Sequence, residues 1–173
     1  GSTFFFTVSM PEGMAQTETG SASHDGVLSA DQPSLEKPQF KSPINVLVVS
    51  PDIKNLTMVE DTGSLGSALA HAVRAVVPEV SDISASQSPS DEEIDNAAAS
   101  AEGRDLVIVG TYNGHLFPRQ AALVRKLAAV GSPTVVVAMR NPYDIKDSAE
   151  IGTYVASYGF RHCSMQAAAE VIF

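Results

Sequence analysis

Two short polar segments of this chain contain side chains that could together form one binding site. Asn113 and His115 follow one apolar stretch, and Asn141, Tyr143 and Asp144 follow another. If both stretches are neighbouring parallel strands, their polar ends meet at the same edge of a sheet. Amides, a phenol and an imidazole donate and accept hydrogen bonds, so this set suits contact with a sugar or with a facing protein surface.

These same residues also have a purely structural interpretation. Asn113-Gly114 is a common turn pair, and Asn141-Pro142 is a common way to end a strand. Tyr143 could pack inside the protein. The sequence leaves the binding interpretation and the structural interpretation both open.

The other reactive residues form no recognised catalytic or metal pattern. The histidines are scattered at positions 24, 71, 115 and 162, and their spacing fits no zinc site. His162 adjoins Cys163, but adjacent side chains point apart and no residue is placed to orient a base. The chain also lacks the G-x-S-x-G elbow of the α/β-hydrolases. We therefore predict no catalytic residue, no cofactor and no metal.

One glycine-containing segment could hold a phosphate. Residues 62–66 read Thr-Gly-Ser-Leu-Gly and open a predicted helix, whose first amides could bind an anion. The segment lies far from the preceding strand, however, and the turn at 50–54 lacks the glycines of a dinucleotide site. An ordinary helix start is the favoured interpretation.

Composition limits the partners. The formal net charge is −9, which argues against binding to nucleic acid or to an anionic membrane surface. No apolar stretch approaches the roughly 20 residues that a membrane span needs. A single cysteine allows no intrachain disulfide and leaves the compartment open.

Apolar runs predict the strands that would position the polar segments. Runs at 44–49, 105–110 and 134–139 indicate buried strands, 80–85 indicates a weaker one, and 153–158 indicates a fifth. Pro51 is expected to stop the first. Helical patterns alternate with these runs, which predicts an α/β fold: a three-layer αβα sandwich with a five-stranded, mostly parallel sheet. The topology is flavodoxin-like or Rossmann-like, and strand order 2-1-3-4-5 is preferred.

Local signals mark the helix ends. Ser90 and Glu93 form a capping box, and Gly103 ends the helix that they open. Pro118 fits the first turn of the next helix. A first helix is expected over 65–77, a short helical turn over 145–149, and a last helix capped by Ser164.

The chain divides into two parts. Residues 1–42 are rich in Ser, Thr, Gly, Gln and Pro, without a helical or strand period, and we expect an irregular leader or linker. Within it, residues 4–8 could alternatively dock as an edge strand. Residues 43–173 are expected to form the sandwich domain.

Residues 44–173 resemble the C-terminal α/β sandwich domain of glycoside hydrolase family 3. The similar branch is that of the two-domain β-N-acetylglucosaminidases (β-N-acetylhexosaminidases), and the most specific motif is a strand followed by Arg140-Asn141-Pro142-Tyr143-Asp144. The segments that carry the resemblance are 46–52, 105–113, 120–124, 135–138 and 140–144.

The resemblance implies a domain that does not itself catalyse. In this family the nucleophile is an aspartate on an N-terminal (β/α)8 barrel, which these 173 residues do not contain. The β-glucosidase branch places its acid/base glutamate in the loop that corresponds to 111–119, but that loop has no carboxylate here. The β-N-acetylglucosaminidase branch uses a His-Asp pair on a barrel loop, so His115 is not that histidine.

The expected partner is therefore the barrel of a parent enzyme, with carbohydrate met only through that parent. Residues that could face the barrel or its cleft are Asn113, His115, Arg140, Asn141, Tyr143 and Asp144. Two alternatives remain: a flavodoxin-type module that binds flavin or a nucleotide, and an oligomerisation or interaction domain.

Overall fold

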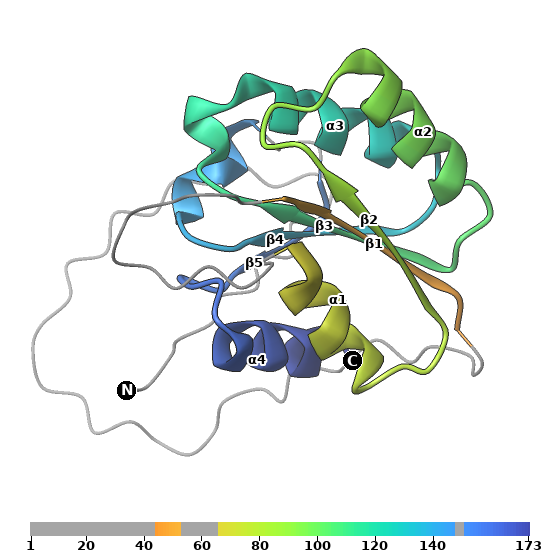
Figure 1. Cartoon of the computed structure of the whole chain (residues 1–173), viewed down its shortest axis with the longest axis vertical. Helices are drawn as coiled ribbons and strands as arrows, with labels where there is room; N and C mark the ends of the chain where they lie inside the picture. The colour runs from red at the N-terminus through yellow and green to blue at the C-terminus, as the bar shows by residue number, and fades with distance from the viewer. Residues whose placement is uncertain (1–43, 53–65, 148–150) are drawn as a thin grey trace, which may run out of the picture.

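The computed structural model describes residues 44–52, 66–147 and 151–173. Within these ranges five strands form one parallel sheet in the order β2-β1-β3-β4-β5 (Figure 1). The strands are β1 (Val46–Pro51), β2 (Val80–Ala85), β3 (Leu106–Thr111), β4 (Thr134–Ala138) and β5 (Thr153–Ala156). The predicted fold class and the preferred strand order are both confirmed.

Helices cover both faces of the sheet and make the three predicted layers. In Figure 1, α1 and α4 lie on one face, and α2 and α3 lie on the other. The described α-helices are α1 (Gly66–Arg74), α2 (Asp91–Ala101), α3 (Pro118–Ala129) and α4 (His162–Ile172). Two 3-10 helices, η1 (Gly114–Leu116) and η2 (Pro142–Asp147), follow the ends of β3 and β4.

Each face of the sheet carries its own apolar core. Alternate residues of β1 point to opposite faces, so Val46 and Val48 pack with α1 and α4, while Leu47 and Val49 pack with α2 and α3. All six residues of β1 and of β3 are buried. This two-sided burial is why both strands are apolar runs and not alternating patterns.

The capping box that opens α2 forms as predicted. The Glu93 amide donates to Ser90 Oγ (3.2 Å), and the Ser90 amide donates to Glu93 Oε2 (2.8 Å). The Ser86 amide and hydroxyl also donate to the Glu93 carboxylate, at 2.8 and 2.9 Å. The backbone hydrogen bonds from Ser90 and then from Ser86 lower the pKa of Glu93 to about 2.

Pro51 does not stop β1 where we expected. The strand includes Pro51, which is in register with Ala85 of β2. The pairing of β1 with β3 ends earlier, at Val49 opposite Val109, so the missing proline N–H removes no bond from that ladder. The Asp52 amide then donates to the Ala85 carbonyl (2.6 Å).

Two helix boundaries also differ from the prediction. Helix α1 ends at Arg74, short of the predicted 77, and Val76 is 44% exposed although the pattern placed it on the buried face. Helix α4 begins at His162 with Arg161 as its N-cap, so Ser164 is not the cap. In both cases the apolar period located the helix but not its first or last turn.

Two shorter elements are displaced. The helical turn predicted over 145–149 is η2, which starts three residues earlier at Pro142 because proline suits a first helical turn. Strand β5 ends at Ala156, before Tyr158, whose φ of 51° lies in the left-handed region.

Several sequence predictions lie outside the described residues. These are the leader over 1–42, the edge strand at 4–8 and most of the phosphate-binding segment at 62–66. They remain predictions, as does flavin or nucleotide binding through that segment. None of the helices that the structure describes has the length and apolar character to cross a membrane.

Candidate functional site

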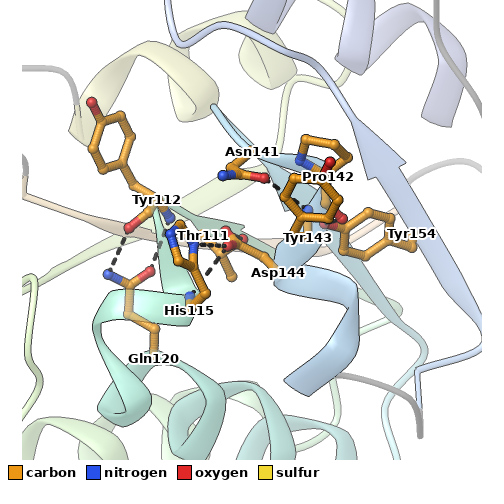
Figure 2. A network of polar contacts seen from close by, with 9 residues as sticks. All are labelled: Thr111, Tyr112, His115, Gln120, Asn141, Pro142, Tyr143, Asp144 and Tyr154. Carbon is orange, nitrogen blue, oxygen red and sulfur yellow. Dashed lines mark hydrogen bonds and ion pairs between the residues drawn. The ribbon is translucent and has the colours of Figure 1, made fainter.

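The candidate site lies where β3 and β4 end side by side. The two strands pair directly, and η1 and η2 continue from their carboxyl ends. Figure 2 shows the polar network that joins these two connections. The structure thus brings the two polar segments of the sequence together, as the parallel topology requires.

Asp144 is the centre of this network. Its side chain is 1% exposed, and its Oδ2 accepts a hydrogen bond from the Thr111 hydroxyl at 2.9 Å. Its Oδ1 lies 3.4 Å from the His115 amide nitrogen and 3.5 Å from His115 Nδ1. A buried carboxylate needs such donors to replace its lost hydration. Asp144 therefore ties η2 to the end of β3 and to η1.

Gly114 makes room for this tie. A Cβ atom built at Gly114 would lie 3.2 Å from the Asp144 carboxyl carbon. The neighbouring Asn113 has a φ of 50°, and Leu116 donates its amide to the Asn113 carbonyl at 2.8 Å. The left-handed residue turns the chain directly beneath Asp144, a conformation that asparagine tolerates better than most residues.

A second set of contacts holds the residue that follows β3. Gln120 is buried, and its side chain accepts from the Tyr112 amide (2.9 Å) and donates to the Tyr112 carbonyl (3.1 Å). The Tyr112 ring points away from Asp144 in Figure 2 and packs edge-on against Phe160, with ring centroids 5.7 Å apart. The Arg140 guanidinium donates to the Tyr112 hydroxyl and lies 5.5 Å from the ring centroid.

The six residues predicted from the sequence therefore do not form a single cluster of contacts. Asp144 and His115 are in contact, whereas Arg140 is directed to Tyr112. The side-chain oxygen of Asn141 accepts from the Tyr143 amide at 3.0 Å, which makes a local turn. Asn113 lies in a turn and Asn141-Pro142 follows the end of β4, as the structural interpretation describes, while a binding role for these residues stays a prediction.

Tyr143 is not a packing residue. It is 62% exposed, and Lys146 Nζ lies 5.6 Å from its ring centroid. Leu116 on η1 is 63% exposed. With the half-exposed His115, these side chains give the edge of the sheet an apolar and aromatic surface. Such a surface fits a sugar face or a partner protein.

The sequence analysis missed Thr111, Tyr112 and Gln120. Thr111 and Gln120 are the two buried polar residues besides Asp144 in this network. A signal existed for Gln120, since it is the third residue of a helix opened by Pro118, a position from which a side chain reaches back to the preceding loop. No group of three His, Cys, Asp or Glu side chains that could hold a metal ion occurs among the described residues.

Comparisons of the sequence find no match, but comparisons of the structure find proteins with a similar fold. No family model and no curated protein matches the chain. A family 3 β-N-acetylglucosaminidase from Paenibacillus sp. is 23% identical, with a TM-score of 0.69, over 91% of this chain and 33% of that chain. A fungal multi-domain family 3 β-N-acetylglucosaminidase is 19% identical, with a TM-score of 0.67, over 82% of this chain and 15% of that chain.

A β-glucosidase from Listeria innocua, solved in complex with isofagomine, is also similar. It is 15% identical, with a TM-score of 0.60, over 75% of this chain and 21% of that chain. The chain spans at most about a third of the length of these three enzymes. Its fold is therefore that of one part of glycoside hydrolase family 3 enzymes, among them two β-N-acetylglucosaminidases.

Proposed function

We propose that this chain is the non-catalytic C-terminal domain of a family 3 β-N-acetylglucosaminidase-like enzyme. The parent would hydrolyse the glycosidic bond of terminal β-linked N-acetylglucosamine. This domain would pack on the catalytic (β/α)8 barrel and line one side of its cleft. The observation that carries the proposal is the likeness of fold to only a part of two β-N-acetylglucosaminidases.

The role of Asp144 supports the absence of catalysis in this domain. A retaining glycosidase commonly needs two carboxyl groups about 5 Å apart across the scissile bond. The loop over 111–119 contains no carboxylate. Asp144, the carboxylate at this edge that faces it, is buried and accepts hydrogen bonds from Thr111 and His115. A carboxylate enclosed in this way cannot reach a sugar.

The exposed residues at the same edge support a role in contact. Leu116 and Tyr143 are both more than 60% exposed. A partner that buried either side chain would gain up to about 1.5–3 kcal/mol of favourable binding free energy from the hydrophobic effect. The exposed His115 and the partly exposed Asn141 add hydrogen-bonding groups at the same edge. A mixture of apolar, aromatic and hydrogen-bonding groups is typical of protein interfaces.

An activity assay tests the proposal. The isolated chain and the intact parent enzyme would be compared on an aryl β-N-acetylglucosaminide. We expect turnover by the parent and none by the chain, because the nucleophile belongs to the barrel. Comparable turnover by the chain would overturn the proposal, and so would a parent gene that encodes no barrel upstream.

A further inference from the structure

A pocket of about 360 Å³ opens beside the first turn of α4, outside the network around Asp144. Its lining comes from the residue after β4 and from the connection between β5 and α4. Arg140, Tyr158, Arg161, Cys163 and Ser164 contribute to it. This volume lies at the small end of the range for ligand sites, about 300–1,000 Å³, and admits a single small group.

Two guanidinium groups in one pocket are unexpected in a chain of net charge −9. Two arginines elsewhere have carboxylate partners, in the pairs Arg74–Asp82 and Arg119–Asp91. Within residues 44–52, 66–147 and 151–173, neither Arg140 nor Arg161 is paired with a carboxylate. The two arginines therefore give the pocket a positive charge, and no carboxylate of the described residues neutralises it.

The backbone adds donors to the same site. Helix α4 begins at His162, and its N-cap residue makes no side-chain capping bond. The amides of His162 and Cys163 consequently have no acceptor in the described part of the chain. The Ser164 hydroxyl lies against Gly159, where a Cβ atom would come within 2.7 Å of it. Guanidinium, amide and hydroxyl donors are the groups that proteins use to bind oxyanions.

The wall of the pocket is held in place before any ligand arrives. The buried Ser157 hydroxyl is within hydrogen-bonding distance of the carbonyls of Ala138 (3.0 Å) and Gly159 (2.9 Å). Tyr158 between them has a φ of 51°, a conformation that costs on the order of 1 kcal/mol for a non-glycine residue. The consequence is that Tyr158 projects outward, 53% exposed, at the mouth of the pocket.

We propose that this pocket binds the oxyanion group of a small ligand, a phosphate or a carboxylate, between Arg140 and Arg161 at the start of α4. The exposed Tyr158 ring would contact the part of the ligand next to the anionic group. The Arg161 guanidinium can give a bidentate pair to such a group, and Arg140, which donates one N–H to the Tyr112 hydroxyl, has further N–H groups to offer. The proposal is independent of the glycosidase assignment, because the site lies wholly within this chain.

Cys163 provides a reporter, because it is the one cysteine of the chain and it lines the pocket. The rate of its alkylation by iodoacetamide would be measured in the full chain during titration with inorganic phosphate and, separately, with glucuronate. Sodium chloride at equal ionic strength is the reference. We expect roughly threefold slower alkylation at twice the dissociation constant, when two thirds of the pocket is occupied. The more protective of the two probes identifies the anionic group.

Variants decide whether protection arises in the pocket. Arg161→Gln and, separately, Arg140→Gln should abolish the slowing, while Arg125→Gln on α3, across the sheet, should retain it. Arg161 makes no side-chain capping hydrogen bond at the start of α4 that the substitution would remove. The thermal unfolding temperature of each variant checks that it is folded. Equal protection in Arg161→Gln, equal protection by chloride, or no protection by either probe would overturn the proposal.

Discussion

Asp144 illustrates how one buried carboxylate fixes the candidate site. Its two oxygens collect the Thr111 hydroxyl, the His115 amide and the His115 ring from a connection about 30 residues earlier in the chain. Asp144 thereby supplies an acceptor to the hydroxyl of Thr111, a residue that is 3% exposed. The exposed positions of His115 and Tyr143 thus depend on a side chain that does not itself reach the surface.

Asp144→Asn should destabilise the fold by about 1–3 kcal/mol, the usual cost of leaving buried donors unsatisfied. In one orientation the amide NH2 would meet the His115 amide donor, and in the other it would face the Thr111 hydroxyl, which would then have to accept instead of donate. Urea unfolding followed by circular dichroism measures the change. Asp95→Asn is the matched control, because Asp95 is 67% exposed and paired with Lys126, and its loss should cost less than about 1 kcal/mol.

The sequence located Asp144 but could not assign its role. An aspartate after a strand, next to Asn141-Pro142 and Tyr143, has the same pattern whether it faces solvent or lies inside. Its partners, Thr111 and His115, are distant in sequence, so only the packing of β3 beside β4 brings them within reach. The exposure of Tyr143 was ambiguous too, because the local hydrogen bond from its amide to Asn141 does not determine whether another element covers its ring.

At the scale of elements, local signals predicted most boundaries and tertiary contacts decided the rest. The capping box at Ser90 and Glu93 formed because all its groups lie within four residues. The predicted start of α4 was wrong because Ser164, a good N-cap by type, is the third residue of the helix and lies against Gly159. The first residue of α4 depends on where the chain lies after β5, and the local sequence around Ser164 does not encode that position.

The Glu93 cap of α2 should make stability depend on pH. Since hydrogen bonds lower the folded pKa of Glu93 to about 2, its contribution is complete above the unfolded value near 4.5 and is lost as the pH falls toward 2. Thermal unfolding of the wild type and of Glu93→Gln should therefore differ most above pH 5 and converge near pH 2. Glu92→Gln, in the same first turn, serves as the control. A constant difference across this range would contradict the assignment.

Gly110 lets α1 approach the centre of the sheet. A Cβ atom there would lie 3.1 Å from Met139 Sδ and 3.3 Å from both Leu69 Cδ2 and Ser50 Cβ. Gly110→Val should therefore cost about 1–3 kcal/mol of unfolding free energy through overpacking. Gly152→Val is the control, because a Cβ at Gly152 meets nothing within 4 Å. If urea unfolding gave equal changes in unfolding free energy for the two variants, the close packing at Gly110 would not contribute to stability.

On the scale of the whole molecule, the two ends of the sheet differ in what they expose. At the carboxyl end, η1 and η2 present Leu116 and Tyr143, and the pocket with Arg140 and Tyr158 opens after β4 and β5. Val76 is the large exposed apolar residue that follows α1, at the opposite end. A parallel sheet gathers all its outgoing connections at one end, so partner contact is expected there.

This asymmetry predicts which substitutions would weaken contact with the proposed catalytic barrel. Leu116→Glu and Tyr143→Glu should leave the unfolding free energy within about 0.5 kcal/mol, because both side chains are more than 60% exposed. Each should weaken association with the co-expressed barrel of the proposed parent about tenfold or more, since burying either side chain is worth about 1.5–3 kcal/mol.

The control variant is Val76→Glu, which changes an exposed apolar residue at the other end of the sheet and should leave association unchanged. Size-exclusion chromatography and titration calorimetry measure both quantities. Association that weakens with Val76→Glu and not with the two edge variants would place the barrel at the opposite end of the sheet.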